Sequence, residues 1–202
     1  MDAAPAKATA AFGFLTVLES AEHGLFGGYL VLSPQGRPLE FRCSTPVAAS
    51  RAQEILYGPT LRPYLVAEVI GKALIAGAEL DAAVILTDQH DMLPLALLRH
   101  EEVLLVQEPD AAAATFSVAA TSADAASDFE LAEPRTSLII NGCEIIASTV
   151  STRTPAEIAA LLEPLAANVY LAEPFQRIRA ALTEAQLASH DDAESAHDRA
   201  AA

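Results

Sequence analysis

Three short segments near the start of the chain are rich in β-branched, aromatic and leucine residues, and turn-type residues separate them. They read FGFLTVLES from residue 12, GGYLVLS from residue 27 and PLEFRCST from residue 38, and the PQGR before the third is a turn signal. Apolar runs of this length, with turns between them, are typical of consecutive antiparallel strands. Residues 12–45 are therefore predicted to form a three-stranded antiparallel meander.

Segments of helix and strand type alternate after the meander. LRPYLVAEVIGKALIA, residues 61–76, places Leu61, Leu65 and Val69 at i,i+4 spacing beside a second apolar row, which predicts a helix that covers a sheet. AAVILTD and EEVLLVQEP are apolar runs of the buried-strand type, and MLPLALLRH between them is predicted to be a short helix. The order is β-β-β-α-β-α-β, and the predicted fold class is α+β with a mixed sheet.

The chain is predicted to divide into five parts. A disordered N-terminus, 1–11, precedes an α+β core domain, 12–109. Residues 110–134 are alanine-rich and acidic, which is typical of a linker or long loop. Residues 135–188 are predicted to form a hairpin and two helices packed on the core, and 189–202 a disordered tail.

Two local signals support the C-terminal element. Asn141-Gly142 between two apolar triplets is the strongest short hairpin signal in the chain. Thr154 and Glu157 have the spacing of a helix capping box, and Pro155 suits the first helical position. EPFQRIRAALTEAQL then predicts a last amphipathic helix with its arginines facing outward.

The chain has 27 acidic and 12 basic residues and a formal net charge of −15. This surplus repels phosphate backbones, so nucleic acid is predicted to be an unlikely partner, and no membrane partner is expected. Cys43 and Cys143 lie too far apart in sequence for a zinc knuckle or a thioredoxin-type pair. Neither a signal peptide nor a bilayer-spanning apolar run occurs, so a cytoplasmic location is predicted.

The order β-β-β-α-β-α-β is that of the ribonuclease H-like fold, which invites a search for clustered carboxylates. Glu19 follows the first strand, Glu54 or Glu68 lies on the helical stretch, and Asp88 closes VILTD. Such acids can hold two divalent ions ~4 Å apart, which activate water and stabilise a leaving oxygen. A metal-dependent phosphodiesterase or nuclease with Glu19, Glu54 and Asp88 is therefore the alternative function. The absence of an aspartate inside the first strand and the acidic net charge weigh against it.

Other polar motifs have structural explanations. DQHD places Asp88 or Asp91 where a helix N-cap is expected, and its single histidine lacks a second one in register for a metal site. Gly24, Gly27 and Gly28 precede a strand rather than open a helix, so they are predicted to form a hairpin loop and not a phosphate-binding loop. Standard hydrolase, NTPase and zinc-protease motifs do not occur, and neither a cofactor nor a metal site is predicted.

The segment RAQEILYGPTL, which starts at residue 51, is predicted to join two helices. Ser50 and Gln53 have capping-box spacing, and the Gly-Pro pair ends the first helix. Ile55 and Leu56 are predicted to face inward. Capping and packing therefore explain most of this segment without a binding function.

Four of the twelve basic residues gather around this segment, and Tyr57 lies among them. If the third strand and the helix start lie side by side, these arginines form a cationic patch suited to carboxylates or to an acidic protein surface. The leading prediction is therefore a non-enzymatic cytosolic adaptor or complex subunit that binds a protein partner or a second copy of itself. The predicted binding residues are Arg37, Arg42, Arg51, Tyr57 and Arg62.

The run GGYLVLSPQGRPLEFRCSTPVAASRAQEILYGPTLRPYL resembles an uncharacterised family of bacterial hypothetical proteins. The motifs that carry the resemblance are Gly-Tyr-Leu-Val, Gly-Arg-Pro-Leu-Glu-Phe and Arg-x-Gln-x-x-Leu-Tyr-Gly, and EPFQRIRAAL looks like the same family's closing helix. The resemblance implies that the meander and the broken helix form one unit. It implies no activity, catalytic residue or substrate.

Overall fold

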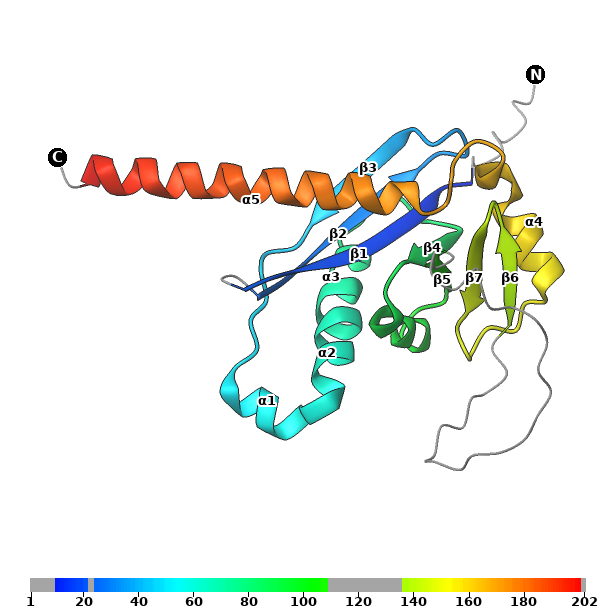
Figure 1. The fold of residues 1–202 in the computed structure, drawn as a ribbon, viewed down its shortest axis with the longest axis horizontal. Helices are drawn as coiled ribbons and strands as arrows, with labels where there is room; N and C mark the ends of the chain where they lie inside the picture. The colour runs from blue at the N-terminus through cyan, green and yellow to red at the C-terminus, as the bar shows by residue number, and fades with distance from the viewer. Residues whose placement is uncertain (1–9, 22–23, 109–135, 201–202) are drawn as a thin grey trace, which may run out of the picture.

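The computed structural model describes residues 10–21, 24–108 and 136–200, with side chains described up to residue 186. Its centre is one seven-stranded mixed sheet in the order β3-β2-β1-β4-β5-β7-β6 (Figure 1). The predicted α+β fold class is confirmed. The strands are β1 (Phe12–Ser20), β2 (Gly24–Leu32), β3 (Pro38–Cys43), β4 (Val84–Thr87), β5 (Glu102–Gln107), β6 (Ser137–Ile140) and β7 (Cys143–Ala147).

Strand β1 lies at the junction of the antiparallel and parallel parts of the sheet. It pairs antiparallel with β2 and parallel with β4, and β4 pairs parallel with β5. The β6–β7 hairpin differs from the prediction of an element packed on the core, because β7 pairs antiparallel with β5 and extends the same sheet. Without β7, one edge of the buried strand β5 would leave its backbone N–H and C=O groups unpaired.

Helices cover both faces of the sheet. One face packs against α4 (Pro155–Ala166) and α5 (Glu173–Ala200), and β1 contributes Phe12 and Phe14 to this core. The other face packs against α2 (Leu61–Pro63), the π-helical η2 (Tyr64–Gly71), α3 (Lys72–Ala76) and the 3-10 helix η3 (His90–Leu97), with Leu15 and Val17 of β1. Because successive residues of a strand point to opposite faces, β1 joins the two cores.

Gly27 and Gly28 lie inside β2 and not in the predicted hairpin loop. A methyl group at Gly27 would overlap Ile70 of η2, and one at Gly28 would overlap Ile178 of α5. Helices on both faces therefore approach the backbone of β2 too closely for a side chain, which is a common reason for glycine within a strand.

The chain projects away from the sheet at α1 (Arg51–Tyr57) and η1 (Gly58–Thr60) (Figure 1). The capping box of Ser50 and Gln53 is present, and Gly58 ends α1 at φ +53°. The prediction that Ile55 and Leu56 face inward is wrong, because they are 68% and 80% exposed and α1 has no buried residue. A short helix outside both cores has nothing to bury its apolar side chains against.

In the C-terminal part, the predicted hairpin turn and the predicted start of helix α4 are both present. Asn141 and Gly142 adopt φ of +50° and +80° at the hairpin turn, and Thr154 and Glu157 form a capping box at α4. Helix α5 continues to Ala200, where the sequence predicted a tail from residue 189. This stretch is rich in alanine, which has the highest helix propensity of the residues.

The predicted linker, 110–134, and nearly all of the predicted disordered N-terminus, 1–11, lie outside the described residues. Within the described part of the chain, every helix is too short or too polar to cross a bilayer.

Candidate functional site

The parallel strands β1 and β4 lie side by side, so their carboxyl ends meet at one edge of the sheet. Two of the acids predicted from the sequence lie at this edge, since Glu19 is near the end of β1 and Asp88 directly follows β4. Ends of parallel strands are a common location of binding sites in sheets covered by helices. The polar contacts at this edge define the candidate site.

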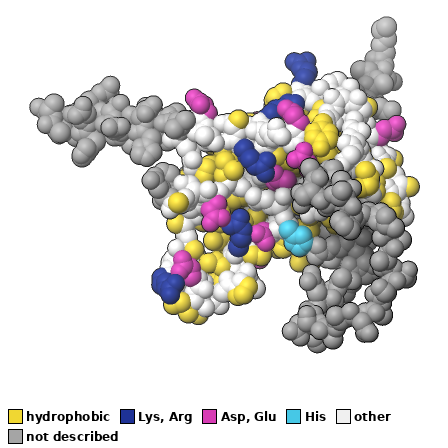
Figure 2. Space-filling view, in the orientation of Figure 1, with side chains coloured by type: hydrophobic (Ala, Val, Ile, Leu, Met, Phe, Trp, Pro, Cys, Tyr) yellow, Lys and Arg dark blue, Asp and Glu magenta, His cyan; other side chains and the backbone are white. Residues whose placement is uncertain are grey.

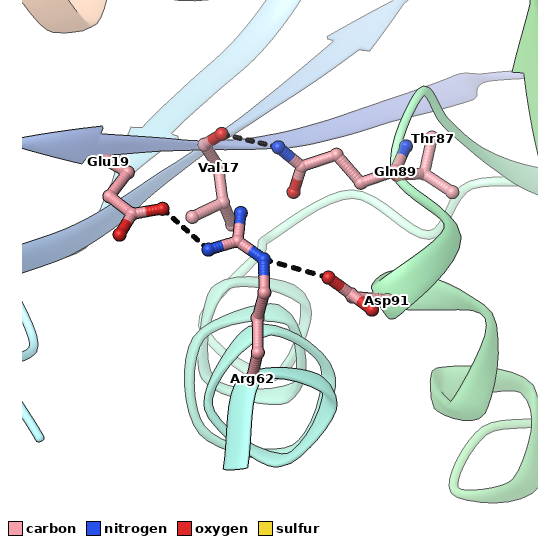
Figure 3. A network of polar contacts seen from close by, with 6 residues as sticks. All are labelled: Val17, Glu19, Arg62, Thr87, Gln89 and Asp91. Carbon is pink, nitrogen blue, oxygen red and sulfur yellow. Dashed lines mark hydrogen bonds and ion pairs between the residues drawn. The ribbon is translucent and has the colours of Figure 1, made fainter. Parts of the chain in front are cut away.

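Arg62 of α2 holds one part of the site together (Figure 3). Its Nη1 donates to Glu19 Oε2 at 2.6 Å, and its Nε donates to Asp91 Oδ2 at 2.8 Å. Hydrogen bonding to Glu19 raises the pKa of Arg62 above its ordinary value, so the guanidinium stays charged. Arg62 therefore links the end of β1 to η3 across the helix-covered edge.

Gln89 ties the same edge together from the loop after β4. Its Nε2 donates to the carbonyl oxygen of Val17 at 2.6 Å, and its backbone N–H donates to Thr87 Oγ1 at 3.2 Å (Figure 3). Its Oε1 is buried and has no hydrogen-bond partner within the described protein. Gln89 thus fixes the loop on β1 while leaving one acceptor open.

Asp88 forms a separate contact on the opposite face of the sheet. Its Oδ2 accepts from Arg179 of α5, and its side chain is only 14% exposed. Among the residues that the structure describes, Asp88 Oδ1 is buried without a hydrogen-bond partner, and so is Oγ1 of the fully buried Thr16 in β1. Buried acceptors without a donor are uncommon in folded proteins, so these two oxygens mark a place for a ligand group.

The oxygens at this edge are of the type that hard divalent cations bind. Asp88 Oδ1 is a carboxylate oxygen and Thr16 Oγ1 is a neutral oxygen, and Mg²⁺ and Mn²⁺ prefer oxygen ligands of both kinds. Among the described residues, however, no three Asp, Glu, His or Cys side chains come together as a metal cluster. A two-ion centre therefore does not fit.

The three acids of the sequence-predicted nuclease site have three different partners. Glu19 pairs with Arg62, Asp88 pairs with Arg179, and Glu54 pairs with the exposed Arg51 on its own helix. The reading of Asp88 or Asp91 as a helix cap is also wrong, since Gln89 occupies the N-cap of η3 and makes no side-chain cap bond.

Several residues of the site were not found by sequence reasoning. Arg62 was predicted only as part of a cationic patch, whereas Asp91, Thr16 and Arg179 were not assigned to a site at all. For Thr16 a sequence signal exists. It follows Phe12 and Phe14 at two-residue spacing in the same strand, so its side chain is expected to point to the same buried face. No local signal pairs Arg179 with Asp88, since 91 positions separate them.

The predicted arginine patch is not a continuous surface. Arg42 pairs with Glu40, Arg51 pairs with Glu54, and Arg62 lies in its own network. Arg37 is exposed in the turn before β3, and the ring of Tyr57 packs on that of Tyr64 at a centroid distance of 4.7 Å. On the face in Figure 2, basic side chains are interspersed with acidic ones.

A groove of about 570 Å³ lies beside Arg62. It runs between the α1–α2 arm and the end of the β1–β2 hairpin, over the apolar side chains of Leu25, Val47 and Leu65. Glu19 and Glu54 both line it, but Asp88 does not. The part of the site around Arg62 therefore has room for a ligand larger than a single small ion, whereas Asp88 lies outside this groove.

No protein-family model matches this sequence, and no curated protein matches it. Among solved structures, the chain is similar to a crystal structure of Ciona intestinalis endonuclease V in complex with a 23-mer DNA that contains an inosine followed by a ribo-adenosine. The two share 13% identity over 86% of each chain, with a TM-score of 0.44.

Two predictions made from the sequence disagree with this likeness, that of a non-enzymatic adaptor for a protein partner and that of nucleic acid as an unlikely partner. The contacts supply a physical reason against the first. The adaptor prediction relied on one continuous cationic patch, but Arg42, Arg51 and Arg62 lie in three separate ion pairs with different acids of the same chain.

Proposed function

We propose that this chain is a metal-dependent phosphodiesterase that acts on nucleic acid, with Asp88 as its central acid. The observation that carries the proposal is the buried, open Oδ1 of Asp88 at the carboxyl end of β4. The strand order β3-β2-β1-β4-β5, with β2 antiparallel to the others, supports it as the arrangement of the ribonuclease H-like fold.

The residues at the edge divide into two chemical roles. Asp88 and Thr16 would supply oxygens to a divalent cation, and the chemistry that such an ion would supply is activation of water and stabilisation of the leaving oxygen. Arg179 and Arg62 supply guanidinium groups, which bind phosphate oxygens with good geometry. Gln89 keeps the loop that carries Asp88 in place on β1.

The ion pairs of the free protein are compatible with these roles. The carboxylate of Asp88 would bind a cation and the guanidinium of Arg179 would bind a phosphate group, so each member of this ion pair would exchange its partner for a new one of the same charge. The net charge of −15 opposes substrate approach, and only a few arginines lie at this edge. Salt screens both the overall repulsion and the local attraction, so the salt dependence of binding is expected to be shallow.

The test is cleavage of end-labelled single-stranded and double-stranded DNA and RNA oligonucleotides with Mg²⁺ or Mn²⁺. Asp88→Asn is expected to lower the rate by at least about a hundredfold, in line with loss of a charge-stabilising catalytic group. Calorimetric titration is expected to detect Mn²⁺ binding by the wild type and to lose it in Asp88→Asn.

Asp81→Asn is the matched control, because Asp81 is an exposed aspartate outside the candidate site. It is expected to leave both cleavage and Mn²⁺ binding unchanged. Cleavage that survives Asp88→Asn, or a wild type that neither cleaves nor binds Mn²⁺, would overturn the proposal.

A further inference from the structure

Strand β3 is an edge of the sheet, and its outer side pairs with no strand in the described part of the chain. The backbone N–H of Ser44 donates to the carbonyl oxygen of Gly27 at 2.9 Å, so residue 44 directs its backbone groups toward β2. Because these groups alternate in direction along an antiparallel strand, Phe41 and Cys43 direct theirs away from β2. Such an edge is a template for pairing with a further strand.

On one face of the sheet, the side chains of this edge form an apolar row. Leu39 is 48% exposed, Phe41 is 41% exposed, and Cys43 is exposed beside them. Phe41 lies opposite Leu30, which belongs to the core under α5, so the row lies on the α5 face. Helix α5 packs over β1 and β2 and leaves much of the row open to water. An apolar row along an unpaired edge favours contact with another chain.

The opposite face of β3 carries one negative and one positive side chain. Glu40 accepts from the backbone N–H groups of Glu79 and Leu80, each at 3.0 Å, which holds its carboxylate in place beside the strand. Arg42 is partly exposed, and its ion pair with Glu40 is long, at 3.5 Å. The guanidinium of Arg42 is therefore able to bind a carboxylate on a neighbouring strand.

The order of these side chains is self-complementary in one antiparallel register. When Phe41 of one copy faces Phe41 of a second copy, Glu40 of each copy faces Arg42 of the other. Opposite charges and aromatic pairs directly across two strands both stabilise a sheet. A shift by two residues brings Glu40 opposite Glu40 or Arg42 opposite Arg42, and like charges then repel. A shift by one residue sets the apolar row of one copy on the charged face of the other.

We propose that β3 pairs antiparallel with β3 of a second copy of this chain, in the register centred on Phe41. The contact is closed, because the same edge of both copies is used. An irregularity of the β2–β3 pairing near Val31 and Leu32 limits regular pairing to the few residues from Glu40 onward. The interface is therefore small, and the dimer is expected to be weak and reversible. The dimer does not depend on the proposed phosphodiesterase function, since the two share no residue.

The first test is sedimentation velocity of the full chain over a range of protein concentrations, where the wild type is expected to show a reversible monomer–dimer equilibrium. Arg42→Glu puts like charges on both sides of the two-fold axis and is expected to raise the dissociation constant at least about tenfold. Arg51→Glu makes the same charge change on the exposed helix α1 and, as the control, is expected to leave the equilibrium unchanged. A wild type that stays monomeric at every concentration, or equal weakening in both variants, would overturn the proposal.

The second test reads the register by disulfide cross-linking and does not depend on the folding of Arg42→Glu. Residues that face each other as a hydrogen-bonded antiparallel pair have Cα atoms about 5.5 Å apart, which a disulfide can span. Phe41→Cys combined with Cys43→Ser is therefore expected to form a covalent dimer under mild oxidation. Thr45→Cys combined with Cys43→Ser is the control, because its exposed thiol lies far from its own copy across the axis. Equal cross-linking of the two variants shows random collision and contradicts the register.

Discussion

Two arginine–carboxylate contacts join the same edge of the sheet to helices on opposite faces. Asp88 with Arg179 lies under α5, and its carboxylate side chain is 14% exposed, whereas Glu19 with Arg62 lies under α2, and its carboxylate side chain is 63% exposed. In the first contact an acid is removed from water and one of its oxygens has no donor. In the second, water can solvate both partners. The same chemical pair therefore constrains the protein strongly on one face and weakly on the other.

The sharpest way to test this difference is Arg179→Ala. It is expected to lower the free energy of unfolding by about 1 to 3 kcal/mol, because it leaves the carboxylate of Asp88 without its counter-ion in a place closed to water. Urea denaturation followed by circular dichroism measures the loss. Glu184→Ala, an exposed change on the same helix, serves as the control, and an equal loss in both variants would contradict the difference between the faces.

A smaller effect is expected on the other face. Arg62→Ala should cost about 0 to 1 kcal/mol at low salt, since Glu19 is exposed and Asp91 is partly exposed to water. The cost should shrink as salt rises, because the Debye length falls to about 3 Å at 1 M. The free energy of unfolding is measured at low salt and at about 1 M salt. A double-mutant cycle with Glu19→Gln gives the interaction energy of the Arg62–Glu19 pair apart from the other contacts of each residue. A salt-independent loss would mean that Arg62 acts through packing instead.

The smallest effect belongs to Arg51→Ala on the projecting helix α1. Its pair with Glu54 is exposed and spaced at i,i+3, so the change in the free energy of unfolding should stay within about 0.5 kcal/mol. Thermal unfolding of Arg51→Ala and of Arg62→Ala under the same conditions shows which variant loses more stability. A loss larger than that of Arg62→Ala would show that α1 contributes to the folded core.

Most of the fold was predictable because its signals are local. The three-strand meander, the Asn141-Gly142 turn and the capping boxes at Ser50 and Thr154 depend on residues a few positions apart. Gly27 and Gly28 were wrongly predicted to lie in a loop, because the contacts that require glycine at these positions are not local in sequence. Two helices from distant parts of the chain crowd them, and neighbouring residues do not reveal that contact.

The candidate site was predictable only in part, for the same reason. Strand ends placed Glu19 and Asp88 at one edge, but the arginines that hold them come from α2 and α5. Glu54 was included because it lies on the helical stretch, whereas α1 turns out to project from the core. The prediction for Ile55 and Leu56 was wrong for a similar reason. It assumed that apolar residues on this helix pack against the core, whereas α1 lies away from it.

The adjacent glycines of β2 face helices on opposite sides of the sheet, so a substitution at each position would displace a different helix. A methyl group at position 28 would push on Ile178, the residue next to Arg179, while one at position 27 would push on Ile70 in the helical stretch that begins near Arg62. Two neighbouring backbone positions, deep inside the protein and distant in sequence from both arginines of the site, are thus each in contact with a different helical segment, and each of these segments lies next to one of the two arginines.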